Sequence, residues 1–166
     1  RCLGRSLWRF RAIERPPEMS AQDGKPEVPA PFNALLGVRF VSWSEGRAEL
    51  QLKITCDHLN GAFAVHGGVY ATMLDNAVTF CAAFAGKGRP GHRCLTLSLT
   101  TSFVGAAVEG DVLTARARNA GGGRKLVFVQ GEIVNQNGQR LAHGDAVIKR
   151  VAPSSSEPGR SGATEP

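Results

Sequence analysis

The chain has 166 residues, of which 42% are hydrophobic and 20% are charged, a balance that suits one folded domain and excludes a wholly disordered chain. Its net charge is +6, but half of that charge lies in the first 18 residues, which hold five arginines against two glutamates. The rest of the chain has no stripe of Lys and Arg interleaved with aromatic residues, which make up only 7%. We therefore expect no nucleic-acid partner.

The two ends of the chain differ in composition from the part between them. Residues 1–30 are rich in proline and charged residues, and residues 152–166 are rich in Pro, Ser, Gly and Glu. We expect a disordered leader and a disordered tail around a folded domain at 31–151. The Arg-rich start resembles an organellar transit peptide, whereas translation from Met19 would make it an upstream extension. We favour the second interpretation and expect a cytoplasmic protein.

The cysteines and the most apolar run exclude two further classes of protein. None of the four cysteines lies in a C-x-x-C pair, so no zinc or dithiol motif is present and a reduced compartment is the simplest interpretation. The longest mostly apolar run, residues 69–85, carries Asp75 and Asn76 in its middle and is too short and too polar for a transmembrane span. We expect no metal ion, no cofactor and no membrane insertion.

Hydrophobic periodicity predicts the elements of the domain in chain order. The expected elements are a helical turn at 31–37, strands at 38–43 and 47–54, a loop at 55–65, a long helix from Gly67-Gly68 to about residue 85, a loop at 86–91, and strands at 95–104, 112–119, 125–135 and 140–151. Gly121-Gly122-Gly123 is expected to link the middle pair of these last strands. Asn137-Gly138 is a strong signal for a hairpin turn between the final two.

This order of two strands, one long apolar helix and four strands predicts an α+β fold. A helix that is apolar over most of its surface must be covered by other elements. One antiparallel sheet curled around a central helix is therefore the expected architecture. The other face of that sheet needs a partner or water, so we also expect oligomerisation.

The segment His66-Gly67-Gly68 lies where the loop becomes the long helix. Glycine lets the backbone approach a ligand closely, and the first N–H groups of a helix lie at the positive end of its dipole. Such groups suit a carbonyl oxygen that becomes negative during attack on a thioester. The alternative is that the two glycines only permit a tight turn into a buried helix.

Asp75 is the only charged residue between Gly68 and Lys87. A carboxylate in an apolar helix is costly unless it is hydrogen-bonded or solvated, so Asp75 is a candidate nucleophile or general base. The alternative is a solvated stripe, because Thr72, Asp75, Asn76 and Thr79 share one arc of a helical wheel. His66 is a candidate base or a structural residue, and no second His or carboxylate lies at metal-ligand spacing from it.

The segment 58–77, HLNGAFAVHGGVYATMLDNA, resembles the signature of hotdog-fold thioesterases of the PaaI (phenylacetate-pathway) type. That signature has an Asn, then His-Gly-Gly, then an Asp nine residues past the His. Residues 95–104 and 131–140 also resemble this family, and the likeness covers about 32–150. It implies a hotdog fold, one antiparallel sheet around a long central helix, and hydrolysis of an aryl- or medium/long-chain acyl-CoA to free acid and coenzyme A.

The resemblance also implies roles for individual residues. Asp75 would be the nucleophile or the base that activates water. The N–H of Gly67 or Gly68, with Asn60 nearby, would polarise the thioester carbonyl, and Thr96 would help to orient the attacking water.

In the family the site lies at a dimer interface, and pairs of dimers commonly form tetramers. Asp75 would then face Asn60 and Gly67 of the neighbouring subunit, with His66 and Gly68 contacting substrate. Many relatives have Gly three residues after the Asn, where this chain has Phe63, so the acyl pocket is expected to differ in shape.

Coenzyme A carries phosphates, so basic loops are expected near its entry. Arg124 and Lys125 are the first candidates, followed by Lys87, Arg89 and Arg93, and each could equally be an ordinary solvated charge. Two other functions stay open: a non-catalytic acyl-CoA-binding hotdog module, and a hotdog hydratase or dehydratase.

Overall fold

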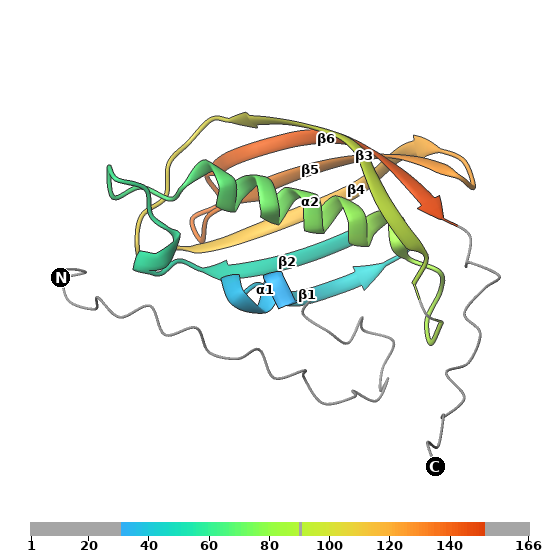
Figure 1. Ribbon diagram of the computed structural model, residues 1–166, viewed down its shortest axis with the longest axis horizontal. Coiled ribbons are helices and arrows are strands. Elements are labelled where there is room, and N and C mark those ends of the chain that lie inside the picture. Colours follow the sequence, from blue (N-terminus) through green and yellow to red (C-terminus); the bar gives the residue numbers. More distant parts are fainter. Residues whose placement is uncertain (1–30, 90, 152–166) are drawn as a thin grey trace, which may run out of the picture.

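The computed structural model describes residues 31–89 and 91–151, which form one antiparallel sheet folded around one long helix (Figure 1). The elements are α1 (Pro31–Leu36), β1 (Arg39–Ser44), β2 (Arg47–Lys53), the 3-10 helix η1 (Cys56–His58), α2 (Gly67–Ala83), β3 (Arg93–Phe103), β4 (Val112–Gly122), β5 (Leu126–Val134) and β6 (Arg140–Val151). The expected leader and tail lie outside the described residues.

The six strands form one sheet in the order β1-β2-β4-β5-β6-β3, and every neighbouring pair is antiparallel. The expected α+β hotdog architecture is therefore confirmed. Among the described strands, β3 pairs only with β6 and β1 only with β2, so these two strands form the edges of the sheet.

The core lies between α2 and the concave face of the sheet. The most buried residues of the helix include Met73, Leu74, Ala77 and Val78, all with 0% exposure. A Cβ added at Gly131 of β5 would lie only 3.0 Å from Leu74 Cδ2 and 3.2 Å from Val78 Cγ1. Glycine at that position therefore lets the helix pack directly on the middle of the sheet.

Two expected boundaries are wrong in detail. The expected loop at 55–65 contains η1 and a β-bridge between Leu59 and Val65. Gly121 and Gly122 belong to β4 and do not only link it to β5. Both have a positive φ, and a Cβ at Gly122 would collide with the carbonyl oxygen of Leu126, so glycine keeps the strands paired up to their turn.

The described part of the chain contains no helix that is long and apolar enough to cross a membrane.

Candidate active site

Asp75 of α2 and Thr96 of β3 face one another. The Thr96 hydroxyl donates a hydrogen bond to Asp75 Oδ1 over 2.7 Å. Thr96 lies next to a β-bulge, because the register between β3 and β6 shifts between Thr96 and Ser98. A bulge inserts an extra residue and re-aims side chains, and such bulges are common beside active sites. The structure therefore brings together the two residues that the resemblance assigned to nucleophile activation.

Thr79 extends this pair into a chain of three polar groups. Its hydroxyl lies 3.2 Å from that of Thr96. Because the Thr96 hydrogen is directed at Asp75, Thr79 donates and the Thr96 oxygen accepts. The sequence argument placed Thr79 only in a polar stripe, although its position four residues after Asp75 puts both on one side of the helix. One carboxylate oxygen is thereby held, and Asp75 Oδ2 has no partner among the residues that the structure describes.

Asn76, the next residue, lies on the other flank of α2. Its side chain exchanges two hydrogen bonds with Asn33 of α1, of 3.1 and 2.8 Å, and also donates to the carbonyl of Thr72 over 2.9 Å. Asn33 is buried. The polar arc expected from the helical wheel is thus divided, since Asn76 fastens α1 to α2 while Asp75 faces β3.

His66 and the two glycines form the start of α2. The Nδ1 atom of His66, the N-cap residue, accepts a hydrogen bond from the N–H of Gly68 over 2.9 Å. His66 therefore acts as a helix cap through this nitrogen. The N–H of Gly67 has no partner in residues 31–89 and 91–151. Of the two candidate donors for a substrate carbonyl, Gly67 is the one that the fold leaves available.

The loop before α2 is a tight hairpin that Asn60 holds together. Asn60 Oδ1 accepts hydrogen bonds from the backbone N–H of Ala62 and Ala64, over 2.8 and 3.3 Å. The backbone N–H of Asn60 also donates to the carbonyl of Ala64 over 2.8 Å. Its Nδ2 group makes no hydrogen bond within the described parts of the chain, so it remains a donor for a ligand.

Two buried residues fix the position of this loop: His58, which the sequence argument missed, and Tyr70. His58 accepts from the N–H of Thr55 through Nδ1, so its Nε2 donates to the carbonyl of Leu36 over 2.9 Å. The hydroxyl of Tyr70 accepts from the N–H of Ala107 over 3.0 Å. Burial is the main cause that raises the pKa of Tyr70 above 10.0, so the phenol is neutral at neutral pH. Nothing in the spacing of either residue signals these contacts.

The Gly67 N–H and the Asp75 carboxylate lie too far apart within one subunit to act on one carbonyl. Asp75 lies eight positions after Gly67 in the same helix, which corresponds to about 12 Å at 1.5 Å per residue. A nucleophile must approach to about 3–3.5 Å of the atom that it attacks. One subunit therefore holds these two candidate groups apart and cannot bring them to the same substrate atom.

The basic candidates for phosphate binding do not lie near Gly67 in the same subunit. Arg124 and Lys125 are exposed in the turn between β4 and β5, at the opposite end of the molecule from the start of α2 (Figure 1). Lys87, Arg89 and Arg93 are also exposed and precede or begin β3. None of the five has an ion pair within the described residues.

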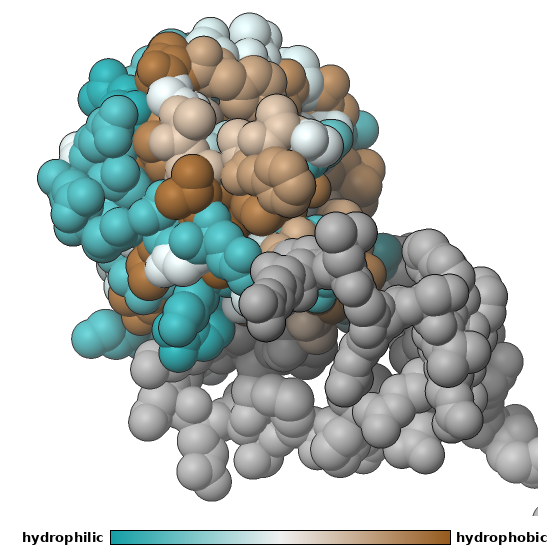
Figure 2. Space-filling view, turned by 90° about the vertical axis from the view of Figure 1, so that its left-hand side faces the viewer, coloured by the Kyte–Doolittle hydropathy of each residue, from teal (hydrophilic) through white to brown (hydrophobic). Residues whose placement is uncertain are grey.

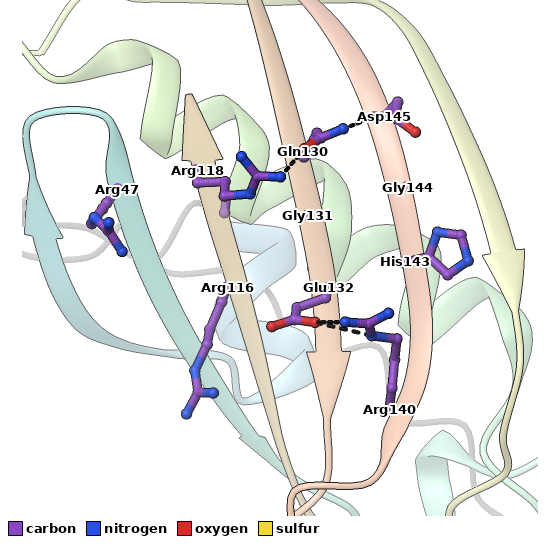
Figure 3. A pocket seen from close by; sticks show the side chains of 11 residues that line it. Arg47, Arg116, Arg118, Gln130, Gly131, Glu132, Arg140, His143, Gly144 and Asp145 are labelled. Carbon is purple, nitrogen blue, oxygen red and sulfur yellow. Dashed lines mark hydrogen bonds and ion pairs between the residues drawn. The ribbon is translucent and has the colours of Figure 1, made fainter. Parts of the chain in front are cut away.

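A hollow of about 390 Å³ lies on the outer face of the sheet, away from α2 (Figure 3). Four arginines and two carboxylates line it: Arg140 pairs with Glu132 at 2.9 Å, Arg118 donates to Gln130, and Gln130 donates to Asp145 over 2.9 Å. None of the expected catalytic residues lines it. In the same described ranges, no group of three His, Cys, Asp or Glu side chains could hold a metal ion.

Comparisons with known proteins indicate the class of protein. The family model described as the thioesterase superfamily matches residues 64–142. The acyl-coenzyme A thioesterase PaaI of Escherichia coli is 30% identical over 107 residues, which cover 64% of this chain and 73% of the relative. Acyl-coenzyme A thioesterase 13 of Homo sapiens is 26% identical over 115 residues, covering 68% of this chain and 80% of the relative.

A solved structure shows the same likeness in three dimensions. The Escherichia coli PaaI protein from the phenylacetic acid degradation operon superimposes with a TM-score of 0.66 at 27% identity, and the match covers 72% of this chain and 83% of that one. The chain belongs to the thioesterase superfamily, which confirms the resemblance and the enzyme class expected from the sequence.

Proposed function

We propose that this chain hydrolyses acyl-CoA thioesters to a free acid and coenzyme A, with an active site shared between two subunits. The observation that carries the proposal is the pair of complementary half-sites: a carboxylate held by Thr96, and an unused N–H at the start of α2. The names of the relatives, which are acyl-coenzyme A thioesterases, supply the substrate class.

The edge strand β3 supports a dimer that joins the half-sites. Leu95, Leu97 and Phe103 are all more than half exposed along its 11 residues, and a long apolar edge strand invites pairing with another strand. Gly67 lies beside one end of β3, since a Cβ on it would be 3.6 Å from the Phe103 ring, whereas Thr96 lies near the other end. Antiparallel pairing of two β3 strands would therefore bring Gly67 of one subunit toward Asp75 of the other.

In this arrangement the N–H of Gly67 and the amide of Asn60 hold the thioester carbonyl oxygen. Asp75 of the other subunit takes a proton from water while the hydroxide adds to the carbonyl carbon. The negative oxygen is stabilised by the Gly67 N–H, and the intermediate collapses to the acid and the coenzyme A thiolate, which is then protonated. Alternatively, Asp75 attacks first and forms an anhydride that water hydrolyses. Thr96 keeps the carboxylate aimed in either route.

Contacts with the rest of the substrate follow from the same dimer. We propose an aryl- or medium/long-chain acyl group as the substrate, which agrees with the phenylacetic acid operon of one relative. Lys149 of β6 pairs with both Leu95 and Leu126, so the β4–β5 turn lies near the start of β3. Arg124 and Lys125 then lie near the end of β3 that carries Thr96. There they can bind the phosphates of an acyl-CoA whose thioester carbonyl is held by the other subunit. His66 and Gly68 border the thioester carbonyl of the substrate. Two such dimers associate into a tetramer.

Thiol release tests the proposal. Purified protein is offered a panel of acetyl-, medium-chain, long-chain and phenylacetyl-CoA with a thiol-trapping dye. We expect turnover of at least one of the longer or aryl substrates, and Asp75→Asn should lower kcat by about 10²- to 10⁴-fold, the range for loss of a general base. Glu45→Gln, the same change of acid to amide in the exposed β1–β2 turn, serves as the control and should retain full activity.

Three results separate the alternatives. Tight binding of acyl-CoA without thiol release from any substrate would replace the proposal by a binding module. Hydration of an enoyl-CoA without thiol release would favour a hydratase. Full activity of Asp75→Asn would refute the role of the carboxylate.

A further inference from the structure

Phe63 adopts a backbone conformation that suits glycine. It is the only non-glycine residue with a positive φ, of 60°, within residues 31–89 and 91–151. Its N–H donates to the carbonyl of Asn60 over 3.0 Å, and the N–H of Asn60 donates to the carbonyl of Ala64 over 2.8 Å. This is the pattern of a three-residue hairpin in which a turn is followed by one left-handed residue, a position that glycine normally occupies.

An aromatic residue at this position carries an energetic cost, because the left-handed conformation crowds Cβ against the backbone. Among the described residues no close packing offsets that cost, since Phe63 is 74% exposed. Residues held in such conformations cluster at sites where the strained geometry serves a function. The Phe63 side chain therefore contributes little to the packing of the described residues.

The surroundings of Phe63 belong to the proposed active site. The hairpin that carries it leads directly to Gly67, and the N–H of Val65 donates to the carbonyl of Ala107 over 2.9 Å, which joins the hairpin to the segment after β3. The end of β3 and that segment together add three further apolar residues that are more than half exposed: Phe103, Val104 and Val108. Figure 2 views the end of the molecule where α2 begins, and hydrophobic residues gather on one half of this surface.

We propose that Phe63 is a specificity-determining residue, whose ring forms an apolar wall beside the Gly67 N–H and favours acyl-CoA with an aryl or long apolar acyl group over acetyl-CoA. This inference rests on the proposed function and names the residue that sets its substrate class. An acyl group whose carbonyl is held by the Gly67 N–H must extend over the exposed apolar residues around that N–H. A long or aromatic group buries the Phe63 ring, whereas an acetyl group is too short to do so.

The test compares Phe63→Gly with the wild type on phenylacetyl-, long-chain and acetyl-CoA. We expect kcat/KM for the preferred long or aryl substrate to fall about tenfold or more, as for the loss of a large apolar contact, while kcat/KM for acetyl-CoA stays within about twofold. The melting temperature should stay the same or rise, because glycine adopts a φ near +60° without strain. Phe63→Leu keeps apolar bulk and should keep most of the preference.

Phe128→Ala is the matched control, because it removes an exposed ring from the outer face of the sheet, and it should leave the substrate preference unchanged. An unchanged preference in Phe63→Gly would overturn the inference while leaving the proposed hydrolysis intact. An equal loss on all substrates, or dissociation of the oligomer in size-exclusion chromatography, would also overturn it by showing a structural role. If the wild type releases thiol from no acyl-CoA, the proposed function itself fails.

Discussion

The two flanks of α2 use similar polar side chains for different purposes. On the β3 flank, Asp75 accepts one hydrogen bond from Thr96 and keeps its second oxygen unused by the described residues. On the α1 flank, Asn76 uses its amide fully, in a reciprocal pair with the buried Asn33 and in a bond to its own helix. Adjacent residues in the sequence thus differ in whether their hydrogen-bonding capacity is consumed by the fold.

This difference separates a candidate catalytic group from a structural one. A polar group whose partners all lie within the subunit contributes to stability, because its removal leaves a buried partner unsatisfied. A polar group that has unused hydrogen-bonding capacity and lies beside an exposed edge strand is available to a ligand or to a second subunit. Variants on the two flanks should therefore affect different measurements.

The largest effect is expected on the β3 flank. Thr96→Val keeps the shape of the side chain but removes the hydroxyl that aims Asp75, so we expect kcat to fall by about 10- to 100-fold, since a hydrogen bond to a charged group contributes about 1.5–3 kcal/mol. The urea midpoint should change little. Thr79→Val, which removes the next hydroxyl of the chain, should have a smaller effect in the same direction. A large loss of stability with unchanged kcat in Thr96→Val would contradict this division of roles.

The converse is expected on the α1 flank. Asn76→Ala leaves the buried amide of Asn33 without its partner, and we expect the free energy of unfolding in urea to fall by about 1–3 kcal/mol. The value of kcat should remain within about threefold of the wild type at a temperature where the variant is folded. The double variant with Asn33→Ala should be less destabilised than the sum of the two single changes. Additive losses would show that the two amides do not act as a pair.

A smaller, pH-dependent effect is expected outside both flanks. Asp111 accepts hydrogen bonds from the Gln136 side chain and from the N–H of Val108, and these lower its pKa below 3.8. A carboxyl group whose pKa is lower in the folded state stabilises the fold at pH values above its pKa in the unfolded chain. This contribution is lost as the pH falls through the pKa of the folded state. Asp111→Asn should therefore be less stable than the wild type at pH 7 by about 1 kcal/mol or less, and the difference should shrink as the pH falls below 3.8 and through the folded value. A pH-independent difference would contradict the assignment to ionised Asp111.

The fold could be predicted well from the sequence because each element carries its own signal. The alternating strands and the long apolar helix each show a clear period, and their order leaves few ways to cover the helix. The ends of the strands were harder to predict, because Gly121 and Gly122 resemble a linker in sequence yet pair as strand residues in the structure.

The site could be predicted only in part. The segment from His66 to Asp75 was visible because glycines and a carboxylate are unusual in an apolar helix. The helical wheel could not separate Asp75 from Asn76, because that distinction depends on α1 and β3, which contact α2 from distant parts of the chain. The choice between Gly67 and Gly68 likewise depends on the His66 cap, which only the structure shows.

Gly67→Pro offers a way to remove the proposed donor while retaining the helix. Gly67 is the first residue of α2, a position where proline is favoured because its missing N–H has no partner within the helix. His66 has φ −64° and ψ 136°, a conformation that suits the residue before proline. The variant therefore lacks one N–H group and should be inactive with little loss of stability.

Complementation between Asp75→Asn and Gly67→Pro tests most directly whether the site is shared between subunits. Each variant alone should be inactive. In a mixed dimer, Asp75 of the Gly67→Pro subunit meets Gly67 of the Asp75→Asn subunit and restores one of the two sites. Random assembly of equal amounts by co-refolding should recover about a quarter of wild-type thiol release. Mixed dimers, verified by differential tagging, that remain as inactive as the two parents would show that Asp75 and Gly67 do not act together across the interface.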